Sequence, residues 1–306
     1  MQIIRPGTKI DFMRKRRGAL LISGCLIIAG IVSLIVHGGP NYGIDFAGGT
    51  LVQVRFSQPI SLDELRESLK DAKLAGAVQR FGAEGVGEYL IRLQTTSSDV
   101  EGLSSTINDT LAKRFGEDTF EIRRTEMVGP KVGKDLRKKG LQAIIAALIG
   151  ILIYISIRFE FRFAIGAVVA LAHDVMITVG VFSLTDKEIS LPVLAALLTI
   201  VGYSLNDTIV VYDRIRENMQ RMRTEAYEKV INLSINETLS RTILTSVTTL
   251  IVIAILFLLG GGVIHNFAFA LLIGIIVGTY SSIFVASPVV IFLEQRFPTK
   301  GEKRKK

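Results

Sequence analysis

The chain has 306 residues, of which 49% are hydrophobic, and its formal net charge is +8. A soluble protein this apolar would need one very large core. Here the apolar residues instead form long runs separated by charged stretches, a pattern typical of membrane proteins. The single cysteine, Cys25, excludes an intramolecular disulfide and argues against redox chemistry.

Six apolar runs each approach the roughly 20 residues that cross the hydrocarbon layer as a helix. They are 18–36, 141–157, 163–184, 189–211, 242–259 and 267–293. The first follows a basic stretch, 14–17, but it is long for a signal peptide, and residues 37–40 offer no small-x-small cleavage site. We therefore expect it to be an uncleaved first span.

Lysine and arginine residues gather on one side of these predicted spans. Six precede the first span, six lie in the loop 212–241 and six follow residue 293, whereas the turns 185–188 and 260–266 carry one and none. The positive-inside bias therefore predicts that both termini and the loop are cytoplasmic. The excess charge needs only anionic lipids as a partner, and not nucleic acid.

The polar segment between the first two spans must fold outside the membrane. Residues 51–56, 77–81, 88–93 and 119–128 have the pattern of strands, and 61–73 and 99–115 that of helices, the first opened by a capping box at 61–64. The order β-α-β-β-α-β predicts a ferredoxin-like domain. It has no metal-spaced Cys or His, no phosphate loop and no nucleophile with a base, so we expect a binding or docking surface and not an enzyme.

Glycines and a proline mark the two junctions between this domain and the membrane. The residues of interest are Gly43, Asp45, Gly48, Gly49, Gly129 and Pro130. Glycine permits backbone angles closed to other residues, and proline fixes one. The junctions are either ordinary tight turns or a hinge on which the outer domain swings, and the residues alone leave both open.

Residues 170–180 place Asp174 near the middle of the third span. An aspartate there costs roughly 2.5 to 3.5 kcal/mol on insertion scales, and such residues usually mark ion pathways. The alternative is a purely structural role, in which a neutral Asp174 is hydrogen-bonded to Ser or Thr of neighbouring helices. His173 lies about 100° round the helix from Asp174, so we expect a packed imidazole and not a metal ligand.

The fourth span ends with Asn206, Asp207, Asp213 and Arg214. Asp207 and Arg214 are seven residues apart and lie on one helical face. Because the turn between the third and fourth spans is short, we expect a buried acidic cluster with Asp174 deepest, Asp207 nearer the cytoplasm and Arg214 at the interface. Alternatively, Asp213 and Arg214 only cap the helix at the lipid headgroups.

Three further patterns look structural. Small residues recur every four positions in the sixth span, a stripe that favours close helix packing; they are Ala270, Gly274, Gly278, Ser282 and Ala286. Hydroxyl side chains open the fifth span, where they could hydrogen-bond across the bundle or line a wet channel. The amphipathic, basic segment 215–233 predicts a helix lying on the membrane.

The predicted organisation is a cytoplasmic segment 1–17, a first transmembrane helix 18–36 and an extracytoplasmic domain 37–138. A five-helix transmembrane bundle 139–293, with the cytoplasmic loop 212–241, and a basic cytoplasmic tail 294–306 follow. The fold class is thus an α-helical polytopic membrane protein with a small α+β outer domain.

Five motifs resemble the SecF branch of the SecD/SecF family of bacterial protein-export subunits. They are GIDFAGGT (43–50), VGPKVG (128–133), AHD (172–174), GYSLNDT (202–208) and YDRIREN (212–218). Their order and spacing match along nearly the whole chain. The resemblance implies membership of the RND transporter superfamily, a place in the bacterial inner membrane and no cofactor beyond the proton as coupling ion.

The same resemblance implies partners and a mechanism. The partners are SecD, the SecYEG channel, YajC and the translocating preprotein, and the proton gradient drives translocation and release on the outer side. The family's proton-path residues correspond to Asp174 and also to Asn206, Asp207 and Arg214, and SecD is expected to supply a facing acidic residue. Two alternatives remain, half of an RND-like exporter of small molecules or lipids, and a passive assembly scaffold.

Overall fold

The computed structural model describes residues 8–72, 74, 76–81, 87–93 and 100–297. Six helical segments in this part of the chain are long and apolar enough to cross a membrane, which confirms the predicted fold class. They are α1 (Phe12–Val36), α5 (Pro130–Arg158), α6 (Phe161–Leu184), α7 (Leu191–Arg221), α8 (Tyr227–Leu259) and a last segment made of α9 (Gly261–Ser281), the π-helical turn η2 (Ser282–Ala286) and α10 (Ser287–Arg296).

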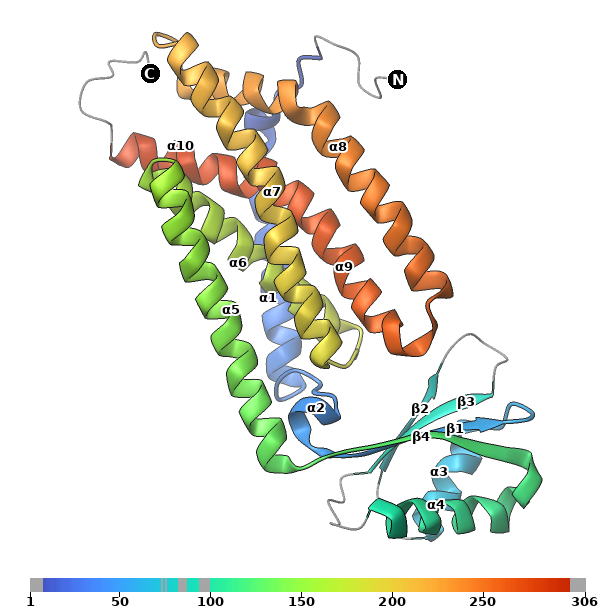
Figure 1. Ribbon diagram of the computed structural model, residues 1–306. Coiled ribbons are helices and arrows are strands. Elements are labelled where there is room, and N and C mark those ends of the chain that lie inside the picture. Colours follow the sequence, from blue (N-terminus) through green and yellow to red (C-terminus); the bar gives the residue numbers. More distant parts are fainter. Residues whose placement is uncertain (1–7, 73, 75, 82–86, 94–99, 298–306) are drawn as a thin grey trace.

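The helices differ in how far the bundle encloses them. The third and last spans are the most enclosed, whereas α1, α5 and α8 present most of their apolar side chains outward, as lipid-facing helices do. The start of α1 and the end of α10 lie at one end of the bundle and the sheet domain lies at the other (Figure 1). This arrangement agrees with a chain that crosses the membrane six times.

The outer domain has the predicted order of strands and helices. Its elements are β1 (Gly49–Phe56), α3 (Leu62–Asp71), β2 (Gly76–Phe81), β3 (Glu88–Leu93), α4 (Val100–Phe115), the 3-10 turn η1 (Glu117–Thr119) and β4 (Phe120–Val128). The antiparallel sheet has the order β2-β3-β1-β4, which confirms the split βαβ unit. Most of the predicted turn at 82–87 lies outside the described residues.

Alternating side chains of the strands build the core of this domain. Val52, Val54 and Ile91 are fully buried against Leu65 of α3 and Ile107 of α4. The two helices therefore cover one face of the sheet, and in Figure 1 that face is turned away from the bundle.

The expectation of one surface helix at 215–233 is wrong. The fourth span continues as α7 to Arg221, and a new helix, α8, begins at Tyr227. The two helices stay paired beyond the apolar stretch, because Asn218 Nδ2 donates to Ser234 Oγ at 3.1 Å and to Glu237 Oε2 at 2.7 Å. The apolar face of the segment thus packs within the helix pair and not on lipid.

The segment before α1 is fastened to α8 by asparagine side chains. Asn236 accepts from the Ile10 backbone N–H at 2.9 Å and donates to the Ile10 carbonyl at 2.8 Å. Asn232 accepts from the Phe12 N–H and donates to the Asp11 carboxylate. The Arg14 backbone N–H and the Asn232 amide lower the pKa of Asp11 by stabilising its charged form.

The junction after α1 contains a short helix, α2 (Ile44–Ala47), which was not predicted from the sequence. Gly48 follows it with φ +79° and ψ 169°, a region open essentially to glycine. A Cβ at Gly48 would lie 2.9 Å from Pro130 Cα, so the two junctions pass each other here in direct backbone contact. Gly133 of α5 packs equally closely on Phe46 and Gly48.

The same junction is bonded to the turn between α6 and α7. The Ile189 N–H donates to the Asn41 carbonyl at 2.7 Å, and the Gly43 N–H donates to the Ile189 carbonyl at 2.9 Å. Asp45 Oδ2 accepts from the N–H of Leu191, the first residue of α7, at 2.8 Å. The junction is therefore held at the outer ends of the two helices that carry the intramembrane aspartates.

The close approach at Gly48 predicts an asymmetry between two junction glycines. We expect Gly48→Ala to destabilise the protein by about 1 to 3 kcal/mol, because alanine suffers both the disfavoured backbone angles and the overlap with Pro130. Denaturant unfolding of the purified protein in detergent measures the loss. Gly129→Ala is the matched control, since Gly129 has a negative φ and its Cβ would meet no atom within 4 Å. Equal losses for both variants would contradict the steric account.

Candidate functional site

Asp174 lies at the centre of the bundle and none of it is exposed. Its Oδ2 accepts from Ser204 Oγ of α7 at 2.6 Å and from Ser281 Oγ of α9 at 2.8 Å. Its Oδ1 lies 2.9 Å from His173 Nδ1. A carboxyl group inside a membrane needs such partners, because no water replaces them there. Asp174 therefore joins α6, α7 and α9 at one point.

His173 is packed and hydrogen-bonded, yet it is not separated from Asp174 as the helical angle suggested. Its Nε2 lies 2.9 Å from Ser23 Oγ of α1, and its ring stacks on Tyr280 with centroids 6.2 Å apart. Adjacent side chains on a helix diverge at Cβ, but the imidazole is long enough to bend back to its neighbour. His173 thus links α1 to the Asp174 cluster.

Asp207 is buried on another side of α7, with 2% of its surface exposed. Ser246 Oγ of α8 donates to Asp207 Oδ2 at 3.4 Å, and Ser246 also shares a 2.7 Å hydrogen bond with Thr279 of α9. Arg241, which precedes Ser246 in α8, attracts Asp207 electrostatically. The cation that acts on Asp207 therefore comes from α8.

The helices α7 and α9 each contact both carboxyl sites. Ser204 of α7 reaches Asp174 from one turn before Asp207, and Ser281 of α9 reaches Asp174 from two residues after Thr279. A displacement of either helix at one aspartate must therefore move a partner of the other. This shared contact is the geometric basis for coupling between the two sites.

The small residues of the sixth span lie where α9 meets α7. A Cβ at Gly278 would lie 2.9 Å from Ser204 Cβ, and one at Gly274 would overlap the side chain of Ile200. Ser282 is fully buried, and its hydroxyl donates to the Thr279 carbonyl at 2.9 Å. Close packing at these positions brings Ser281 within reach of Asp174.

Asn206 and Arg214 lie apart from the two buried carboxyl groups. Asn206 is exposed on the outer surface of α7. Arg214 Nη1 donates to Glu217 at 2.9 Å, and its Nε lies 3.5 Å from Glu237 of α8. Seven residues, or roughly 10 Å of helix rise, separate Arg214 from Asp207. Arg214 therefore does not join the buried carboxyl groups in one cluster, and its ion-pair partners are Glu217 and Glu237.

The sequence did not show which side chains act on the two aspartates; they are Ser204, Arg241, Ser246, Thr279 and Ser281. The only signal was the run of hydroxyls that opens the fifth span. Serine and threonine are common in transmembrane helices, and most bond to their own backbone. Nothing in their spacing shows which of them face a carboxyl group.

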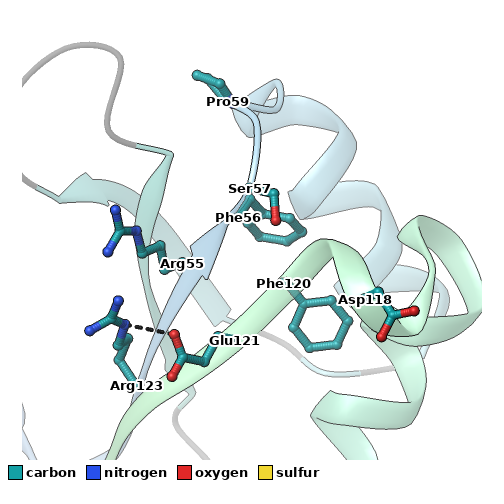
Figure 2. Close-up of a pocket in the computed structure, with 8 residues that line it drawn as sticks. All are labelled: Arg55, Phe56, Ser57, Pro59, Asp118, Phe120, Glu121 and Arg123. Atoms are coloured by element: carbon teal, nitrogen blue, oxygen red, sulfur yellow. Dashed lines mark ion pairs between the residues drawn. The ribbon is translucent and has the colours of Figure 1, made fainter.

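The outer domain carries an open cleft of about 420 Å³ at the end of β1 and the start of β4 (Figure 2). The rings of Phe56 and Phe120 lie beside the charged side chains of Arg55, Glu121 and Arg123, and Arg123 Nε lies 3.0 Å from Glu121. A mixture of aromatic and paired charged groups suits a docking surface. Among the described residues, no group of three His, Cys, Asp or Glu side chains is placed to hold a metal ion.

Two family descriptions match the chain. The C-terminal part of the protein export membrane protein SecD/SecF matches residues 107–296, and the SecD/SecF GG motif matches residues 33–60. The second range contains Gly48 and Gly49, where the two junctions cross.

Relatives match over nearly their whole length. A protein translocase subunit SecF of Magnetococcus marinus is 50% identical over 100% of this chain and 97% of its own. One from Escherichia coli O157:H7 is 42% identical over 95% of this chain and 90% of its own.

Two solved structures of SecDF also match. SecDF from Thermus thermophilus, described as a translocon-associated membrane protein, is 37% identical over 95% of this chain with a TM-score of 0.84. A structure of SecDF in a super-membrane-facing form is also 37% identical but gives a TM-score of 0.69. The chain spans 39% and 40% of those two longer chains.

Six spans around buried carboxyl groups, with a ferredoxin-like domain after the first span, define the class as a polytopic membrane transport subunit. The chain belongs to the SecD/SecF family of protein-export membrane proteins. The relatives cited above carry the SecF name, and the resemblance noted from the five motifs is confirmed.

Proposed function

We propose that this chain is an accessory subunit of the Sec protein-export machinery in the bacterial inner membrane. It works with SecD and uses the proton motive force to promote preprotein translocation and release on the outer side. The names of its relatives and its match to SecDF support this function over export of small molecules or lipids. SecYEG, YajC and anionic lipids are its further expected partners, and the proton is its only coupling ion.

The observation that carries this proposal is the pair of carboxyl groups buried inside the membrane. Asp174 and Asp207 are both almost completely enclosed, and both are hydrogen-bonded by hydroxyl groups from neighbouring helices. Intramembrane carboxyl groups in such settings typically serve proton relays. One proton crossing 100 mV releases about 2.3 kcal/mol, which is enough to bias a domain swing.

The junction offers a way to transmit this energy outward. Asp45 and Gly43 hold the junction to the turn that joins α6 and α7, and Arg92 of β3 forms an ion pair with Glu188 of the same turn. The two SecDF structures match this chain with equal identity but different TM-scores, which is consistent with a fold that changes its internal arrangement. We therefore keep the interpretation that the junctions form a hinge on which the outer domain swings. A movement of the α6–α7 turn would drive that swing.

The outward face of α7 is the proposed contact with SecD. From Ala195 to Asn206 its exposed residues are Ala195, Thr199, Gly202 and Asn206, which recur every three or four positions and include no large apolar side chain; Leu191, one turn earlier, is 38% exposed. Lipid-facing helices of this bundle instead expose isoleucine and leucine, as α5 and α8 do. Small residues allow close helix approach, and an exposed asparagine at this depth favours a protein partner over hydrocarbon.

The proton-relay role predicts the effect of removing either charge. In a reconstituted complex with SecD, we expect Asp174→Asn and Asp207→Asn each to abolish the part of preprotein release that depends on the proton gradient, because asparagine keeps the size of the side chain and cannot carry the proton. Asp109→Asn, on the exposed face of α4, is the control and should leave release unchanged. Full gradient-dependent release by both membrane variants would instead make the chain a passive scaffold.

The proposed SecD contact predicts a position-specific loss of assembly. We expect Gly202→Leu to reduce the SecD that copurifies in detergent by at least about tenfold, which corresponds to roughly 1.4 kcal/mol of lost binding. The matched control is Gly150→Leu on α5, because both glycines have open space around a Cβ. Unchanged copurification with Gly202→Leu would place the SecD contact on another helix.

A further inference from the structure

A row of buried hydroxyl side chains follows one face of α8 on the cytoplasmic side of Asp207. Ser234, Thr238, Thr242 and Ser246 recur every four residues, and at most 7% of any of them is exposed. Side chains four apart lie one above another on a helix. These four residues are termed the α8 hydroxyl row, which extends over roughly 18 Å of helix rise. Ser246, at its inner end, is hydrogen-bonded to Asp207.

The outer end of the row meets charged groups that reach the cytoplasmic surface. Asn218 bridges Ser234 and Glu237, and Arg214 Nε lies 3.5 Å from Glu237. About a third of each charged side chain is exposed, 39% for Arg214 and 33% for Glu237. The row therefore runs from a carboxyl group inside the membrane to charged side chains that are partly exposed.

The middle of the row holds a hydroxyl whose hydrogen-bonding capacity is unused. Thr242 Oγ1 is buried and has no hydrogen-bond partner among the described residues, and the same holds for Thr208 Oγ1 next to Asp207. An unsatisfied buried hydroxyl destabilises the protein, because it has lost its hydrogen bonds to water and gained none in their place. Water bound between hydroxyl groups removes that destabilisation.

The π-helical turn η2 packs against α7, which carries Thr208, and follows Thr279 of α9. Thr208 lies one turn after Ser204 and one turn before Tyr212, whose hydroxyl donates to the Ala286 carbonyl at 3.3 Å. Thr242 lies one turn from Ser246, which bonds to Thr279 just before η2. A π-helical turn breaks the regular backbone hydrogen bonding of a helix and occurs frequently at functional sites.

Other hydroxyls of the fifth span do not share this setting. Thr248 is exposed, and its hydroxyl donates to the Leu244 carbonyl of its own helix at 2.9 Å. Thr238, in the row, also donates to its own backbone, but its oxygen keeps lone pairs that accept further hydrogen bonds. The row is thus distinguished by burial, by alignment and by the free hydroxyl at Thr242.

We propose that the α8 hydroxyl row is the cytoplasmic half of the proton route, which carries protons from Asp207 to the cytoplasmic surface. Each hydroxyl or water oxygen accepts a proton from the neighbour nearer Asp207 and passes its own proton onward. Only O–H bonds form and break, and Asp207 is left as a carboxylate. This inference rests on the proposed proton-driven function.

The test measures proton flux in vesicles that contain the complex with SecD. Thr242→Val removes the hydroxyl and keeps the shape, so flux should fall at least about tenfold, as when a barrier rises by roughly 1.4 kcal/mol. Thr242→Ser restores the hydroxyl and should restore the flux. Thr248→Val is the matched control and should behave as the original protein. SecD copurification reports assembly, and Thr238→Val is the second variant if Thr242→Val fails to assemble.

A labelling measurement shows whether water reaches the α8 hydroxyl row, or whether Thr242→Val lowers the flux only by disturbing helix packing. In a Cys25→Ala background, Thr242→Cys should react with a small charged thiol reagent added on the cytoplasmic side much faster than Val247→Cys, which faces outward. Equal labelling, or a flux that Thr242→Ser does not restore, would overturn the route. If Asp207→Asn stops flux and Thr242→Val does not, the row is refuted and the proton-driven function stands. Flux that survives both Asp207→Asn and Asp174→Asn refutes the function itself.

Discussion

The hydrogen bonds that Ser204 and Ser281 donate to Asp174 are the constraint on which the bundle depends. A carboxyl group at this depth is stable only with donors supplied by neighbouring helices, because the membrane offers none. These bonds need α7 and α9 to approach closely, and Gly278 permits that approach. His173 extends the same cluster to α1 through Ser23. Four of the six spans are thereby tied to one polar centre.

The position of that centre explains how a change in the membrane reaches the outer domain. The helices α6 and α7 leave the Asp174 cluster and meet in the outer turn that Asp45 caps and Arg92 contacts through Glu188. A shift between these helices moves this turn, and with it the junction that carries β1. The backbone contact between Gly48 and Pro130 keeps the two junctions close together, so that a movement of one reaches the other.

The sequence predicted the architecture well, because its signals are periodic and local. Long apolar runs fixed the spans, and alternation with turn residues fixed the strands, so that 88–93 was placed without error. The helix pair at 215–233 was misread, since an amphipathic face does not show whether lipid or another helix covers it. The short helix α2 was not predicted, because its four residues are too few to show helical periodicity.

The candidate site could be predicted only in part. Asp174 and Asp207 were identifiable because a carboxylate inside an apolar run is costly wherever it points. Arg214 was chosen as the basic partner from its position on the same face of one helix. The attraction on Asp207 comes instead from Arg241, which only the pairing of α7 with α8 brings near. The hydroxyl partners depend on helix rotation, which one chain's spacing does not determine.

The most direct test of this account is infrared spectroscopy of the complex with SecD, in which the carboxyl bands report protonation of buried aspartates. When the pH on the cytoplasmic side is lowered, a band of a protonated carboxyl group should grow in the original protein and be missing in Asp207→Asn. A band of unchanged size in Asp207→Asn would show that another group takes up the proton, and would contradict the account.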